Sequence, residues 1–282
     1  MAGTMVEFAS NGGKTAAYLS TPASGKGPGL LVIQEWWGLV GHIKNVCDRF
    51  AAEGFTALAP DMYHGKTADE PDGAGKLFMA LNIGQAEKDL RGAATYLQGR
   101  SSTQKLGAVG FCMGGQLALY AATLNSAVGA CVNFYGVHPN VKPDYTKLSG
   151  PVLGLFAEKD GFVTPQVAKD LDAAIKKAGK HVETHIYPGV DHAFFNDENK
   201  TAYNKTAADA RVLPPEREVA APARRRRRRP SLGASAGRWN PPRPSEPVPS
   251  FRPSCPCRSW SPDDRPAPGR PRAPRRRDAG PP

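Results

Sequence analysis

Residues 105–120 read KLGAVGFCMGGQLALY, and this stretch decides the fold class of the 282-residue chain. An apolar run leads into Gly110, a single Cys112 stands between glycines, and helical periodicity follows Met113. A nucleophile flanked by glycines between a strand and a helix is the pattern of a nucleophile elbow, because glycine permits the sharp turn. A thiol placed there lies at a helix N-terminus, whose dipole favours the thiolate. Cys112 is therefore predicted to be a nucleophile, although a lone cysteine in a turn is more often a buried apolar residue.

Short apolar runs alternate with stretches of helical periodicity on both sides of this elbow. Strands separated by helices require right-handed crossovers, which predict a mainly parallel sheet with helices on both faces. The N-terminal segments 5–9 and 14–20 flank Asn11-Gly12-Gly13 and predict a β-hairpin. The expected strands cover residues 29–34, 56–59, 106–110, 127–134, 152–157 and 182–187, and the expected helices cover about 43–51, 86–97, 113–123 and 165–178.

Two further residues follow predicted strands in the order that a hydrolase triad requires. Asp160 comes after the strand at 152–157, and His192 comes after the last strand. The chain order of nucleophile, acid and histidine is the order of the α/β-hydrolase fold. An Asp-Gly pair alone more often marks a turn, so the order of the three residues carries the argument. Cys112, Asp160 and His192 are predicted to form a triad in which Asp160 orients the imidazole.

Four motifs in the correct order resemble the dienelactone hydrolase family, over roughly residues 5–210. They are QEWWGL at 34–39, PDMYHGK at 60–66, GFCMGG at 110–115 and DHAFFN at 191–196. The resemblance implies an α/β-hydrolase that cleaves a carboxylic ester or lactone through a cysteine acyl-enzyme, without a metal or organic cofactor. It also implies backbone N–H groups of Trp36 and Met113 as an oxyanion hole, and Glu35 as a group that helps to generate the thiolate.

The chain departs from the family at its substrate pocket. Family members that act on carboxylate-bearing lactones have two pocket arginines, whereas the matching places here hold Lys66 and Asn196. A lysine offers a point charge rather than a bidentate fork. The pocket is therefore expected to prefer uncharged esters and lactones. The residues predicted to line it are Trp37, Tyr63, Lys66, Phe194, Phe195 and Asn196.

The composition changes abruptly near residue 212. Residues 1–211 carry 16 Lys and 4 Arg against 20 acidic residues, whereas residues 212–282 carry 17 Arg, no Lys, 6 acidic residues and 18 of the 27 prolines. Residues 1–211 are predicted to fold as the hydrolase domain, and 212–282 to be a disordered tail. A less favoured alternative is that the run Arg224–Arg229 forms an arginine-rich arm that binds nucleic acid. The switch from lysine to arginine suggests a frameshifted C-terminus.

The remaining features favour a cytoplasmic enzyme with a small-molecule substrate. The N-terminus lacks a signal-peptide pattern, and no apolar run reaches the roughly 18 residues of a membrane span. The five cysteines show no metal-ligand spacing, so free thiols and no bound metal are expected. A monomeric protein is also expected. Two alternatives remain: a non-catalytic hydrolase-fold binding module, and a different cysteine-elbow family with peptidase or protective chemistry.

Overall fold

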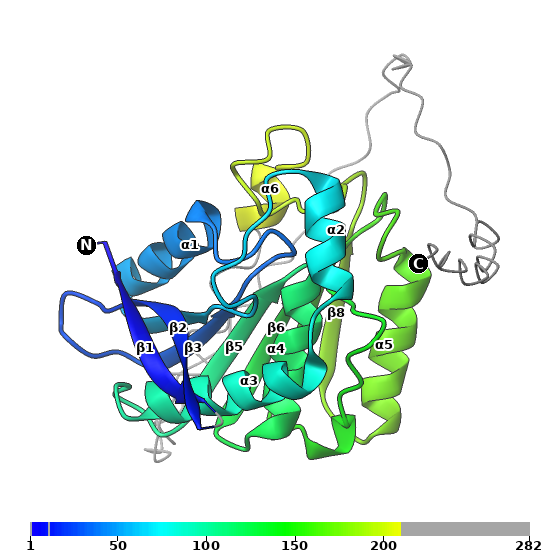
Figure 1. Cartoon of the computed structure of the whole chain (residues 1–282). Helices are drawn as coiled ribbons and strands as arrows, with labels where there is room; N and C mark the ends of the chain where they lie inside the picture. Colours follow the sequence, from blue (N-terminus) through cyan, green and yellow to red (C-terminus); the bar gives the residue numbers. More distant parts are fainter. Residues whose placement is uncertain (1, 11, 210–282) are drawn as a thin grey trace, which may run out of the picture. The chain divides into compact units, whose positions relative to one another are not determined.

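The computed structural model describes residues 2–10 and 12–209, in which an eight-stranded sheet lies between two helical layers (Figure 1). The strands are β1 (Thr4–Ser10), β2 (Gly13–Ser20), β3 (Gly29–Ile33), β4 (Thr56–Pro60), β5 (Leu106–Phe111), β6 (Val128–Phe134), β7 (Val152–Ala157) and β8 (Val182–Tyr187). The helices are α1 (Gly41–Ala52), α2 (Pro71–Met79), α3 (Ile83–Gln98), α4 (Met113–Leu124), α5 (Pro165–Lys177) and α6 (Lys205–Asp209), with a 3₁₀ turn η1 at Tyr145–Lys147.

The strand order is β1-β2-β4-β3-β5-β6-β7-β8. The pairs β1–β2 and β2–β4 are antiparallel, and all later pairs are parallel. The predicted N-terminal hairpin and mainly parallel sheet are therefore confirmed. Gly12 has a φ of 79°, as the tight turn of the hairpin requires. The neighbouring Asn11 lies outside the described residues.

The buried strands send alternate side chains into two separate apolar cores. In β3, Leu31 and Ile33 pack into one core, whereas Leu30 and Val32 pack into the other. This alternation follows from the two-residue period of a strand and explains why the strand sequence is apolar throughout. The first core is completed by residues of α3, α4 and α5, and the second by residues of α1 and α6.

Helix α2 is an element that the sequence pattern did not predict. Its sequence PDGAGKLFM contains Gly73 and Gly75, which lower helix propensity, and only Ala74 is buried. The helix begins with Pro71 at its first position, where the missing N–H is not needed. Its place beside the carboxyl ends of the central strands, rather than its own periodicity, gives it a role at the site (Figure 1).

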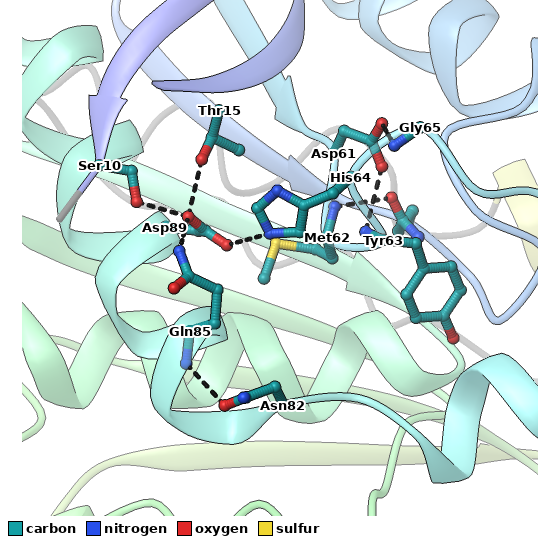
Figure 2. A network of polar contacts seen from close by, with 11 residues as sticks. Ser10, Thr15, Asp61, Met62, Tyr63, His64, Gly65, Asn82, Gln85 and Asp89 are labelled. Atoms are coloured by element: carbon teal, nitrogen blue, oxygen red, sulfur yellow. Dashed lines mark hydrogen bonds and ion pairs between the residues drawn. The ribbon is translucent and has the colours of Figure 1, made fainter. Parts of the chain in front are cut away.

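The connection between β4 and α2 is fixed to the N-terminal hairpin through a buried carboxylate, Asp89 of α3 (Figure 2). Asp89 Oδ1 accepts hydrogen bonds from the hydroxyls of Ser10 (2.5 Å) and Thr15 (2.8 Å) and from the amide of Gln85 (3.0 Å). Its other oxygen, Oδ2, pairs with His64 Nε2 at 2.9 Å. One side chain therefore joins β1, β2, α3 and the loop after β4.

The same loop contacts the elbow. Asp61 accepts hydrogen bonds from the N–H groups of Tyr63 (3.1 Å) and Gly65 (2.7 Å), which close the loop into a tight turn. The Tyr63 hydroxyl then donates to the sulfur of Met113 at 3.1 Å. The loop thus connects the Asp89 network to the residue that follows Cys112.

The predictions for residues 212–282, including disorder, a nucleic-acid arm and a frameshift, lie outside the described residues. Within residues 2–10 and 12–209, no helix combines the length and the apolarity needed to cross a membrane.

Candidate active site

Cys112 stands on a strained turn between β5 and α4. Its φ of 53° and ψ of −125° are unusual for a residue with a side chain. The turn is tight because its glycines are crowded: a Cβ at Gly110 would lie 1.8 Å from the carbonyl oxygen of Gly114, and one at Gly114 would lie 2.3 Å from that of Ile33. The sequence therefore forces the side chain of Cys112 out of the sheet at the N-terminus of α4.

Asp160 and His192 are brought together from the loops after β7 and β8. His192 Nδ1 and Asp160 Oδ2 are 2.6 Å apart. The other carboxylate oxygen accepts the N–H groups of Phe162 (2.7 Å) and Val163 (2.8 Å), so the backbone of its own loop fixes the carboxylate. With Nδ1 committed to Asp160, Nε2 is the ring nitrogen left for Cys112.

The His192 imidazole is held as a strong base. Burial alone would lower its pKa, but hydrogen bonds to Asp160 and to Cys112 outweigh burial and raise the pKa of His192 to about 10. Its ring also packs against Tyr135 and Phe162, with ring centroids 5.0 Å and 5.4 Å away. These contacts fix the plane of the imidazole.

Glu35, at the end of β3, is a buried carboxyl group with a single strong donor. It is 2% exposed, and its Oε2 accepts a hydrogen bond from the Asn196 amide at 2.8 Å. Burial raises the pKa of Glu35 to about 7, although the hydrogen bond from Asn196 acts in the opposite direction. Its second oxygen, Oε1, has no well-formed hydrogen bond. Glu35 is therefore harder to ionise than an exposed carboxyl group.

Tyr135, after β6, is a site residue that sequence reasoning missed. A φ of 41° and two hydrogen bonds between Asn133 and Gly136 fix the turn that carries it. Its hydroxyl lies near Glu35 without a well-formed hydrogen bond, and burial, followed by the charge of Glu35, raises its pKa well above the usual value. Its signal in the sequence is an aromatic residue at the end of a strand, two residues after Asn133 and directly before Gly136.

Trp36 follows β3, and Met113 is the first residue of α4, directly after Cys112. Neither backbone N–H donates a hydrogen bond to the described part of the chain. For Met113 this is expected, because the N–H groups at the start of a helix have no partner within that helix. Their role as an oxyanion hole stays a prediction.

A cavity of about 770 Å³ opens above Cys112 and His192. Its wall is largely apolar, and no lysine or arginine of residues 2–10 and 12–209 lines it. A volume of this size accommodates a ligand larger than a small lactone. The residues that line it include Glu35, Trp36, Trp37, His42, Asp69, Phe78, Tyr135, Phe162, Asn196 and Glu198.

The Dienelactone hydrolase family model matches residues 15–213, well over half of the chain. The chain belongs to the dienelactone hydrolase family. The geometry described above is thus that of a hydrolase of this family, and the predicted fold class is confirmed by the match together with the observed sheet.

Named relatives of this dienelactone hydrolase family member agree with the assignment. The chain is 40% identical over 215 residues to protein usf of Aquifex pyrophilus, covering 73% of this chain and 93% of that protein. It is 37% identical to a protein of Aquifex aeolicus whose name proposes a carboxymethylenebutenolidase, covering 74% of this chain and 94% of the relative. A crystal structure of a proposed dienelactone hydrolase from Klebsiella pneumoniae superposes with a TM-score of 0.67 at 28% identity, covering 74% and 93% of the two chains.

The structure places only part of the predicted pocket on the cavity wall. Trp37 and Asn196 line it. Tyr63 is instead buried against Met113, and Phe194 and Phe195 pack into the core around α1 and α6, because the loop after β8 turns their rings inward. Lys66 is exposed and does not line the cavity.

Several cavity residues of this family member had no signal in the sequence. His42, Phe78 and Glu198 come from α1, α2 and the loop after β8, and only the fold brings them together. Phe162 is 74% exposed at the cavity and packs on Trp36 at 6.4 Å between ring centroids. An exposed aromatic two residues after the triad acid is the one feature that sequence inspection could have used.

The other described cysteines differ chemically from Cys112. Cys47 and Cys131 are fully buried, and burial raises the pKa of each thiol strongly. Within the described part of the chain, no group of three or more His, Cys, Asp or Glu side chains is placed to hold a metal ion.

Proposed function

We propose that this hydrolase cleaves carboxylic esters or lactones that carry no carboxylate, through a thioester on Cys112. The observation that carries the proposal is the placing of a cysteine on a strained elbow beside a His192–Asp160 pair, with Nδ1 and Oδ2 2.6 Å apart. An imidazolium in contact with the sulfur favours a thiolate, which is the nucleophilic form.

The chemistry follows from these positions. The Cys112 thiolate attacks the carbonyl carbon, and the electrons of the C=O bond move to an oxygen that faces the N–H groups of Trp36 and Met113. Collapse of this adduct breaks the C–O bond, and His192 donates its proton to the departing alkoxide. Water then gives a proton back to His192 and attacks the thioester, which releases the acid and restores the thiolate. Asp160 holds the imidazole in the required tautomer throughout.

Glu35 acts on this cycle through charge. A carboxyl group with a pKa of about 7 beside the thiol can accept or hold one proton at neutral pH, so it can assist the formation of the thiolate. Its neighbour Tyr135 provides a hydroxyl on the same wall.

The charge of the lining disfavours a substrate that carries a carboxylate. A substrate carboxylate that loses its water needs charge-assisted donors, and no lysine or arginine of the described residues lines the cavity. A free-acid dienelactone is therefore expected to react at least tenfold more slowly, in kcat/KM, than its methyl ester. Lys66→Ala should leave this ratio unchanged because Lys66 does not line the cavity. A free acid that reacts faster than the ester would contradict the exclusion of carboxylate-bearing substrates.

The nucleophile is tested by the pair Cys112→Ala and Cys47→Ala. Cys112→Ala should abolish hydrolysis of a 4-nitrophenyl ester, a loss of more than about 10³-fold for removal of a nucleophile. Cys47→Ala is the control for a buried thiol outside the site. Intact-mass measurement during turnover should show an acyl adduct on the wild type and on Cys47→Ala but not on Cys112→Ala. Full activity of Cys112→Ala would refute the proposed mechanism.

The cytoplasmic location and the monomeric state remain predictions. Size-exclusion chromatography with light scattering of the full chain tests the second, and a mass near the 30.1 kDa of one chain is the expected result.

A further inference from the structure

Apart from the imidazole of His192, the charged side chains that line the cavity are carboxyl groups. Three carboxyl groups line it, from Glu35, Asp69 and Glu198, and none of them forms an ion pair within the described part of the chain. His42 also lines the cavity, but burial lowers its pKa and keeps its ring neutral at pH 7. The described wall therefore carries negative charge that no fixed cation balances, apart from the imidazole of the triad.

Aromatic rings stand beside these carboxylates. Trp36 and Trp37 meet edge to face with their ring centroids 5.1 Å apart, and Phe162 packs against Trp36. Asp69 is tied to this pair, because the N–H of the preceding Ala68 donates to the Trp37 carbonyl at 3.0 Å. Glu35 directly precedes Trp36, so each tryptophan is linked through the backbone to a segment that carries one of these carboxyl groups.

Buried polar atoms on this wall lack partners. Glu35 is 2% exposed, yet its Oε1 makes no well-formed hydrogen bond, and the hydroxyl of the fully buried Tyr135 is in the same condition. Both residues line the cavity. A buried carboxyl group with so few donors gains from a positive charge placed in the cavity.

We propose that the cavity contains a subsite for an alkylammonium group, so that the preferred substrates are positively charged esters or lactones. The inference deepens the proposed function and rests on it. Aromatic faces attract a substituted ammonium through their quadrupoles, and carboxylates add a longer-range attraction. A cation carried on the acyl or alcohol part of an ester would lie against Trp36 and Trp37, between Asp69 and Glu35. Glu198, on the loop after β8, adds negative charge along the approach.

The test compares a choline ester with its 3,3-dimethylbutyl counterpart, in which carbon replaces the ammonium nitrogen at the same size. The acyl group and the size are the same, so the ratio of the two kcat/KM values, divided by the ratio of the two alkaline hydrolysis rates, measures the effect of the charge in the cavity. The choline ester is expected to react about tenfold faster at low ionic strength. Added salt should reduce this ratio, because it screens the carboxylates at the rim.

Variants test whether the preference for the choline ester arises at the proposed subsite. Asp69→Asn and Glu198→Gln should each reduce the ratio several-fold, and Trp37→Leu should reduce it through loss of the aromatic face. Asp170→Asn, on the exposed surface of α5, is the matched control and should leave the ratio as it is, since Asp170 does not line the cavity.

The outcomes separate the two proposals. If both esters are hydrolysed in a Cys112-dependent manner at equal rates, or the neutral ester is faster, the ammonium subsite is refuted while the hydrolase mechanism stands. If neither ester is hydrolysed, calorimetric titration of Cys112→Ala with phenyltrimethylammonium and with neutral tert-butylbenzyl alcohol decides the subsite alone. Binding of the cation at least several-fold tighter than the alcohol supports it, and equal or weaker binding overturns it.

Discussion

Two buried carboxyl groups in this protein have opposite surroundings. Asp89 is fully buried and receives three hydrogen bonds in addition to its pairing with His64 (Figure 2). Glu35 is almost equally buried but receives one, from Asn196, and leaves Oε1 without a well-formed partner. Desolvation disfavours a buried charge in both places, and only at Asp89 do the neighbours supply donors for both oxygens.

The difference indicates that Asp89 stabilises the fold, whereas Glu35 takes part in the reaction. Donors around Asp89 join the N-terminal hairpin to α3 and to the loop after β4. The shortage of donors at Glu35 raises its pKa to about 7 and leaves it responsive to a proton or a ligand. Variants at each position should therefore affect different properties, stability for Asp89 and pH-dependent activity for Glu35.

The largest effect is expected from Asp89→Ala. Its removal leaves the hydroxyls of Ser10 and Thr15 and the amide of Gln85 without their acceptor, and breaking such a buried cluster costs about 3–5 kcal/mol of unfolding free energy. Urea unfolding measures this loss. Asp89→Asn keeps the shape and part of the bonding, so its loss should be smaller. A change below about 1 kcal/mol in Asp89→Ala would show that the network contributes little.

Glu35→Gln should stabilise the protein, and increasingly so at higher pH. Burial raises the pKa of folded Glu35 from 4.5 to about 7, so ionisation opposes folding. The penalty is absent below pH 4.5, grows as the pH rises towards 7, and then levels off at about 3 kcal/mol, since each pKa unit corresponds to about 1.4 kcal/mol. Unfolding of both proteins at pH 4 and pH 8 tests this. An equal difference at the two pH values would mean that Glu35 is not the titrating group.

The same Glu35→Gln variant should lose activity. Without a carboxyl group that can ionise near pH 7, formation of the thiolate loses its assistance, and kcat/KM should fall about 10–100-fold, or about 1.4–2.8 kcal/mol. The pH profile of kcat/KM separates this role from a structural one. If ionisation of Glu35 assists the reaction, the inflection near pH 7 should disappear in Glu35→Gln. Glu35→Asp, which retains a carboxyl group, should retain the inflection.

The smallest effect is expected from His64→Ala. The His64 side chain is 44% exposed, so water can replace its hydrogen bond to Asp89, which contributes up to about 1 kcal/mol. Three donors remain on Asp89 after the substitution. A loss as large as that of Asp89→Ala would show that the contact with His64 supplies most of the stabilisation.

The triad and its elbow were predictable because they depend on local sequence. Gly110 and Gly114 allow the turn that carries Cys112, and the order of Asp160 and His192 follows from the strands before them. The predicted start of the helix at Pro165 was likewise a local signal, because proline suits the first helical position, and the structure confirms it. Such features need only neighbouring residues, whose backbone geometry restricts the choice of amino acid.

The lining of the cavity was not predictable in the same way. Phe194 and Phe195 carry the same aromatic character as Trp36 and Trp37, yet two enter a core and two face the cavity. Which way a loop side chain points depends on the elements that pack above it, here α1, α2 and α6. Sequence reasoning therefore identified the aromatic residues but not their placement.

The sequence by itself determined the alternation of strands and helices, the nucleophile elbow and the absence of the family's two pocket arginines. Each of these depends only on residue type and spacing. Only the tertiary structure decided that Glu35 lacks donors whereas Asp89 has them, and that Asp69 and Glu198 share a wall with the tryptophan pair. Desolvation and electrostatic fields depend on what surrounds a group in space. For these residues that environment comes from segments far apart in the chain.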